Sequence, residues 1–144
     1  MDQMSSSDMQ ARSRQFLLQL IRGYISTQSI YAAAKLSIAD CLASGPRTSD
    51  ELARRVGAHA PTLRRFLRGL ANLGVVEEQA GGAFSLTVIG EALRSDVPGS
   101  LQGFAILTGE LLSPAREGLL TAVIEGRTPV EDYLGKPLFD YLSE

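Results

Sequence analysis

The sequence predicts a mainly α fold, in which long N-terminal helices are joined to a winged helix-turn-helix with a small β-hairpin. Two observations carry this prediction. Apolar residues recur at helical spacing through the N-terminal third, and a capping box further on opens two short helices that are followed at once by two short strands. The composition agrees, because 44% of the 144 residues are hydrophobic and 21% are charged, as in ordinary globular proteins.

The chain divides into an expected disordered tail, residues 1–11, and one helical domain, residues 12–144, which contains the winged helix at about 47–95. The tail is polar and rich in serine. The lone Cys41 excludes an internal disulfide, the first residues do not resemble a secretory signal, and no apolar run approaches the roughly 18 residues of a membrane span. We therefore expect a cytoplasmic protein with no membrane partner.

The first helical pattern is long and unusually apolar. It continues past a polar gap at Ser26–Ser29 as far as Leu42 and ends at Gly45-Pro46. Little chain remains to cover this surface, so a partner subunit is the expected source, and we interpret these as dimerisation helices. The apolar residues at helical spacing are Phe16, Leu17, Leu20, Ile21, Tyr24, Ile25, Tyr31 and Ala32.

Local signals delimit the winged helix. Thr48 and Glu51 have the spacing of a capping box, Gly57 is a natural stop, and Pro61 suits the first turn of the next helix, which should end at Gly74. The helical period of the apolar residues then ends, and the pattern of residues 75–78 and 83–86 predicts two short strands joined by a turn. Thr87 is placed to cap another short helix over residues 88–94.

Helical spacing returns in the last third of the chain. One helix should begin at Leu101 and be kinked or ended by Pro114, and a second piece should cover residues 115–125. The acidic pair at residues 131 and 132 is expected in a loop, and residues 137–142 should form a short amphipathic turn or helix.

Few residues suggest chemistry. His59 is the only histidine, so neither a zinc set nor a Ser-His-Asp triad is supported. No glycine-rich loop follows a strand, so a Rossmann-type cofactor site is not expected. The sequence therefore assigns no catalytic, cofactor-binding or metal-binding residue.

Three arginines leave a nucleic-acid alternative open. Arg64, Arg65 and Arg68 lie on the second helix of the winged motif, where they could reach phosphates or guanines of DNA. The other interpretation is that they solvate this face and pair with Glu77 or Glu78. The net charge of −2 and a wing turn without lysine or arginine disfavour a nucleic-acid partner.

The order of several short motifs resembles the N-terminal portion of class I S-adenosylmethionine-dependent O-methyltransferases that act on plant phenolics and bacterial polyketides. The resemblance covers about residues 17–144, and no single motif decides it. Where the family often has A-A-x-L-G-I-A-D, this chain has Ala33-Ala34-Lys35-Leu36-Ser37-Ile38-Ala39-Asp40. Further matching stretches are G-P-R-T with E-L-A at 45–53, L-R-R-F-L-R at 63–68, L-G-V at 73–75, F-S-L-T at 84–87, and G-K-P-L-F-D-Y-L at 135–142.

The resemblance implies a homodimer with intertwined N-terminal helices and a winged helix that serves as scaffold. It also implies S-adenosylmethionine as the cofactor of the parent enzyme, and a small aromatic or polyketide-like metabolite as acceptor. The acceptor-binding residues would be Phe104, Leu107, Thr108, Leu111 and Tyr133. For Phe104, Leu107 and Leu111, ordinary core packing is an equal alternative.

Two departures from the family pattern matter. The chain has no tryptophan, and Ser113-Pro114-Ala115-Arg116 stands where the family commonly has one. The Rossmann-like cofactor domain is expected to be absent, so this chain alone should not be catalytically competent. The leading hypothesis is a dimerisation and partial acceptor-binding domain of such an enzyme. The alternatives are a stand-alone small-molecule-binding or interaction protein of the same fold, and a winged-helix DNA-binding regulator.

Overall fold

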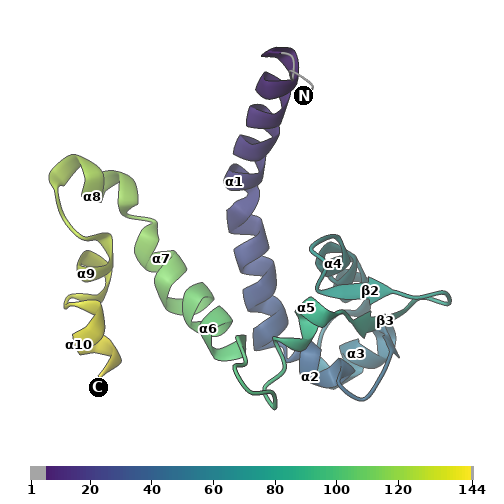
Figure 1. The fold of residues 1–144 in the computed structure, drawn as a ribbon. Helices are drawn as coiled ribbons and strands as arrows, with labels where there is room; N and C mark the ends of the chain where they lie inside the picture. Colours follow the sequence, from purple (N-terminus) through teal and green to yellow (C-terminus); the bar gives the residue numbers. More distant parts are fainter. Residues whose placement is uncertain (1–5, 144) are drawn as a thin grey trace.

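A computed structural model describes residues 6–143 and shows three parts (Figure 1). A long helix, α1 (Ser6–Lys35), projects from the winged helix at its base, and a helical branch leaves that base and returns along the lower half of α1. The disordered tail was expected over residues 1–11, and of these residues 6–11 form the first turns of α1. Residues 1–5 lie outside the described residues. None of the described helices is long and apolar enough to cross a membrane.

The helical pattern after α1 is interrupted at Ser37. This residue adopts a left-handed conformation, with φ 51°, and separates α1 from α2 (Ile38–Leu42). The chain therefore turns at the position where the resembled family often has glycine, a residue that reaches this conformation without steric cost. The turn brings Ile38 and Leu42 into the core of the winged helix.

The winged helix has the predicted elements and one additional strand. Helices α3 (Ser49–Val56) and α4 (Ala60–Asn72) are followed by β2 (Val76–Glu78) and β3 (Ala83–Leu86). A two-residue strand, β1 (Arg47–Thr48), pairs antiparallel with β3, which gives the sheet order β1-β3-β2. Two residues are too few to show a strand period, so the sequence did not indicate β1.

The predicted local signals are confirmed at both ends of α3. The Glu51 amide donates to Thr48 Oγ1 over 3.3 Å, and the Thr48 amide donates to Glu51 Oε2 over 2.8 Å, which completes the capping box. Gly57 closes the helix in the left-handed conformation, with φ 69°. The core lies between α2, α3, α4 and the sheet, and its largest fully buried side chains are Phe84, Ile38, Leu52, Leu67, Leu70 and Val76.

Asp40 connects the winged helix to the helical branch. Its carboxylate accepts a hydrogen bond from the Ser95 amide over 2.7 Å and another from Gln102 Nε2 over 3.0 Å. Gln102 opens the branch, which first passes along α1. Helix α5 (Val88–Glu91), capped by Thr87 as predicted, follows β3 and precedes the branch. The branch elements are α6 (Gln102–Leu107), the π-helical turn η1 (Thr108–Leu112), α7 (Ser113–Arg116), α8 (Leu119–Glu125), α9 (Pro129–Leu134) and α10 (Leu138–Leu142).

Two expectations for the branch are corrected. Of the two outcomes expected at Pro114, a kink or an end, the end is wrong: the preceding turn widens to π geometry, and the Ser113 amide donates to the Thr108 carbonyl, five residues earlier. The π turn leads directly into α7, where proline occupies the first turn and needs no amide donor. The acidic pair Glu131 and Asp132 lies in helix α9 and not in a loop, since Pro129 opens that helix and Gly135 closes it.

Candidate functional site

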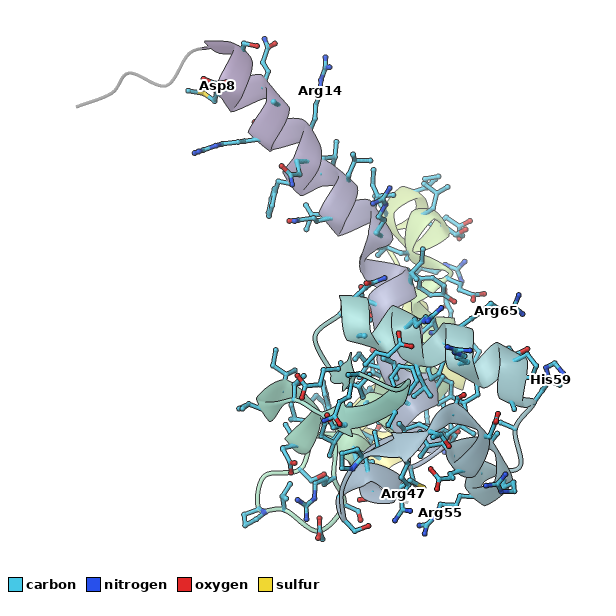
Figure 2. All side chains as sticks on the ribbon, turned by 90° about the vertical axis from the view of Figure 1, so that its right-hand side faces the viewer. Asp8, Arg14, Arg47, Arg55, His59 and Arg65 are labelled. Atoms are coloured by element: carbon cyan, nitrogen blue, oxygen red, sulfur yellow. The ribbon has the colours of Figure 1, made fainter. Side chains whose placement is uncertain are left out.

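The N-terminal two-thirds of α1, up to Ile25, presents a large apolar surface to solvent. Figure 2 shows this part of the helix standing clear of the rest of the chain, with side chains on several sides. Ile21 and Ile25 are each 66% exposed. At 3.6 residues per turn, the apolar positions cover more than half of the helix circumference, which is wider than the stripe of a helix that packs on one surface. The exposed residues are Phe16, Leu17, Leu18, Leu20, Ile21, Tyr24 and Ile25, and we call them the α1 apolar arm.

A second exposed apolar surface lies on α8. Its outward residues include Val123 and Ile124, which are about three-quarters exposed. In Figure 1, α8 lies at the far end of the branch, away from the α1 arm. Together with Leu119 and Leu120, these residues form what we call the α8 apolar face.

The first hollow of interest lies where α6 packs against the C-terminal third of α1. It has a volume of about 330 Å³ and is lined mainly by apolar side chains, with Ser26, Thr27 and Thr108 as the polar members. The polar gap at residues 26–29 thus adjoins this hollow. Thr108 Oγ1 is buried and lacks a hydrogen-bond partner among the described residues. The remaining lining residues of this α1–α6 hollow are Ile30, Leu93, Leu101, Phe104 and Ala105.

The second hollow lies between the π turn and the C-terminal helices. It has a volume of about 650 Å³ and combines aliphatic side chains with two tyrosines and one carboxylate. Volumes of this size suit small-molecule ligands. We call it the η1–α9 hollow, and its lining residues are Leu107, Glu110, Leu111, Tyr133, Leu134, Tyr141 and Leu142.

The five predicted acceptor-binding residues are divided between these hollows. Phe104 and Thr108 line the α1–α6 hollow, whereas Leu107, Leu111 and Tyr133 line the η1–α9 hollow. The structure therefore does not bring all five together, and their role in binding stays a prediction.

The sequence reasoning did not single out two residues of the η1–α9 hollow, Glu110 and Tyr141. Glu110 follows Leu107 by three positions, so helical spacing alone could have placed it beside the residues that were predicted. No comparable signal marked Tyr141, because it comes from a separate helix and only the fold of the branch brings it near.

Glu110 is held by two residues of α1. Lys35 Nζ lies 2.6 Å from Glu110 Oε1, and Tyr31 Oη donates to the same oxygen over 3.3 Å. The hydrogen bond from Lys35, reinforced by its charge, lowers the pKa of Glu110 below its ordinary value. The same contact raises the pKa of Lys35. The hollow therefore carries a carboxylate whose ionised form is favoured by Lys35 and Tyr31.

The three arginines of α4 are arranged around the wing. Arg68 makes two hydrogen bonds to the carboxylate of Glu78, of 2.8 and 2.9 Å, and Arg64 lies 3.9 Å from the same group. The pairing with Glu78 is thus confirmed for both. Arg65 is exposed on the outer face of α4 (Figure 2). Nucleic-acid binding by this trio stays an untested alternative, and the engagement of Arg68 with the wing supports a structural role.

The described residues give little support for metal or base chemistry. His59 precedes α4, where its Nδ1 lies 2.9 Å from Thr62 Oγ1, and Figure 2 shows it at the outer end of that helix. Within residues 6–143, no three His, Cys, Asp or Glu side chains come together as a possible metal site.

Comparisons with known proteins agree on one family. A family model described as the O-methyltransferase dimerisation domain matches residues 18–96. A phenazine O-methyltransferase of Lysobacter antibioticus is 44% identical over 128 residues, which are 89% of this chain and 38% of that protein. The chain thus spans little more than a third of the length of this curated relative.

Solved structures show the same fold. The N,N-8-amino-8-demethyl-D-riboflavin dimethyltransferase of Streptomyces davawensis matches with a TM-score of 0.82 at 32% identity, over 91% of this chain and 39% of that one. An O-methyltransferase from neocarzinostatin biosynthesis, solved in complex with S-adenosyl-L-homocysteine, matches with a TM-score of 0.71 at 27% identity, over 87% of this chain and 42% of that one.

Proposed function

The chain belongs to the O-methyltransferase dimerisation domain family, and on that premise we propose that it provides the self-association surface and part of the acceptor-binding site of a small-molecule O-methyltransferase. The working unit is a cytoplasmic homodimer joined through α1. The α1 apolar arm is the observation that carries this proposal, because a helix that is apolar over more than half of its circumference must be covered from more than one side.

A second copy of the chain can cover the arm from two sides, because it has two exposed apolar surfaces of its own. We place the arm of one subunit between the α1 arm and the α8 apolar face of the other, so that both bare surfaces are covered by one symmetric contact.

The two hollows are the proposed acceptor-binding region. Both lie against the π turn, and such turns occur frequently at functional sites. The phenyl ring of Phe104 and the phenol ring of Tyr133 suit contact with a flat acceptor. The names of the relatives, which include a phenazine and a flavin methyltransferase, favour a small aromatic or polyketide-like metabolite.

The methyl donor does not fit the residues described here. Rossmann-type donor sites are built on parallel strands joined by helices, whereas the sheet within residues 6–143 has three short antiparallel strands. In the parent enzyme we assign S-adenosylmethionine to a part of the protein other than these residues. The chain itself contributes contacts to the acceptor and no step of methyl transfer.

Multi-angle light scattering at micromolar concentration tests the proposal. We expect a mass twice the 15.5 kDa of one chain. A mass equal to one chain across the micromolar range would contradict the assignment, because it would show that the α1 apolar arm does not mediate self-association.

A further inference from the structure

We propose that Glu110 determines the specificity of the η1–α9 hollow by accepting a hydrogen bond from an N–H or O–H group carried on the aromatic ring of the ligand. The inference rests on the proposed function, since it assumes that this hollow receives the acceptor, and it adds the feature of the acceptor that is recognised. Ligands with a phenolic hydroxyl or aromatic amine then bind better than the same rings without a donor.

The first argument concerns the two oxygens of the Glu110 carboxylate, which have different roles. Lys35 and Tyr31 both contact Oε1, at 2.6 and 3.3 Å. Their contacts hold the group from the α1 side and leave Oε2 for a ligand. Glu110 also lines the hollow, and in this proposal its second oxygen, Oε2, makes the contact with a bound molecule.

The second argument is the contrast between this carboxylate and the rest of the lining. Four leucines and two tyrosines share the lining with one carboxylate, which suits a flat aromatic molecule that carries polar groups on its ring. Lys35 keeps the carboxylate charged. A donor that pairs with a charged acceptor forms a stronger hydrogen bond than one that pairs with a neutral acceptor.

The third argument is that the backbone under Glu110 is fixed. The preceding residue, Gly109, lies against the ring of Tyr31, with no room for a side chain between them. The π turn accommodates this approach and sets the direction of the following residue. A pre-positioned acceptor costs less conformational entropy on binding than a mobile one.

A pair of matched probes tests the inference. Binding of 1-naphthol and 1-methoxynaphthalene to the chain is measured by isothermal titration calorimetry, since the two differ in the donor and share the ring. We expect the chain to prefer 1-naphthol by about tenfold, as one charge-assisted hydrogen bond allows. Glu110→Gln, which keeps the shape and removes the charge, reduces this preference to about twofold or less. Glu131→Gln on α9, outside the hollow lining, leaves it unchanged.

The outcomes separate this inference from the proposed function. If both probes bind and Glu110→Gln keeps the full preference, the role of Glu110 is overturned while the acceptor hollow stands. If neither probe binds, both the acceptor hollow and this inference fail. The side chain of Glu110 is 43% exposed, so the substitution should preserve the fold, and an unchanged melting temperature and light-scattering mass verify that.

Discussion

The ring of Tyr31 lies where a side chain at position 109 would have to be. A Cβ built on Gly109 would come within 2.1 Å of Tyr31 Cγ. This contact joins α1 to the π turn, and both neighbours of the glycine, Thr108 and Glu110, line the proposed acceptor hollows. The position of both hollows therefore depends on a residue that has no side chain.

Gly109→Ala should lower the free energy of unfolding by about 1–3 kcal/mol, because the added methyl group forces the two elements apart. Thermal or urea denaturation checks this. Gly103→Ala is the matched control on α6, where a Cβ meets nothing within 4 Å. It should raise stability by about 0.5–1 kcal/mol through better helix propensity. Equal effects of the two substitutions would contradict the proposed contact.

Thr108→Val should stabilise the free chain by about 1 kcal/mol, because it replaces a buried hydroxyl that has no hydrogen-bond partner within the described residues. Thr87→Val is the opposite case. The Thr87 hydroxyl caps α5 and accepts from the Gly90 amide over 3.2 Å, so its loss should cost about 1–2 kcal/mol. Urea unfolding of both variants measures the difference, and destabilisation by Thr108→Val would show that the hydroxyl is satisfied in solution.

Ser37→Gly should raise the free energy of unfolding by about 0.5–1 kcal/mol, because glycine reaches the left-handed conformation without the steric cost that serine bears. At Gly57, which has φ 69° and open space around it, the opposite effect is expected. Gly57→Ala should lower the free energy of unfolding by about 1 kcal/mol. Chemical denaturation compares both variants with the parent chain. A destabilised Ser37→Gly variant would mean that the serine side chain contributes more than its backbone conformation costs.

Ile21→Glu should weaken self-association by roughly 100-fold or more, because a charge would have to be buried in the subunit contact. The side chain is 66% exposed within one chain, so the melting temperature of the monomer should change little. Gln19→Glu, on the polar side of the same helix, is the matched control and should keep the dimer. Sedimentation equilibrium measures both, and an unchanged dimer in Ile21→Glu would exclude the arm from the contact.

The Arg68–Glu78 pair should make stability depend on pH in the acid range. Hydrogen bonds from Arg68 lower the pKa of Glu78 below its ordinary value of 4.5. A carboxyl group with a lowered folded-state pKa stabilises the fold above about 4.5 and loses that contribution as the pH falls through the lowered value. Glu78→Gln and Arg68→Met should each flatten the acid side of the stability profile, and retention of the parent slope in both would rule out this pair as the cause.

The sequence by itself determined the features that depend on neighbours along the chain. The Thr48–Glu51 capping box, the left-handed stop at Gly57 and the turn between β2 and β3 involve residues only a few positions apart, so their types and spacing suffice. The same holds for the apolar period of α1, which predicted a helix with more apolar surface than one chain covers.

Only the tertiary structure decided how distant segments meet. Strand β1 pairs with β3, and Gly109 of the π turn packs on Tyr31, 78 positions earlier in the chain. The five predicted acceptor-binding residues were divided between two hollows, and Glu110 was brought to Lys35 and Tyr31, by the packing of the branch on α1. Periodicity reports which face of a helix is apolar, but it carries no information about which other segment covers that face, because that choice is made by packing among residues far apart in the sequence.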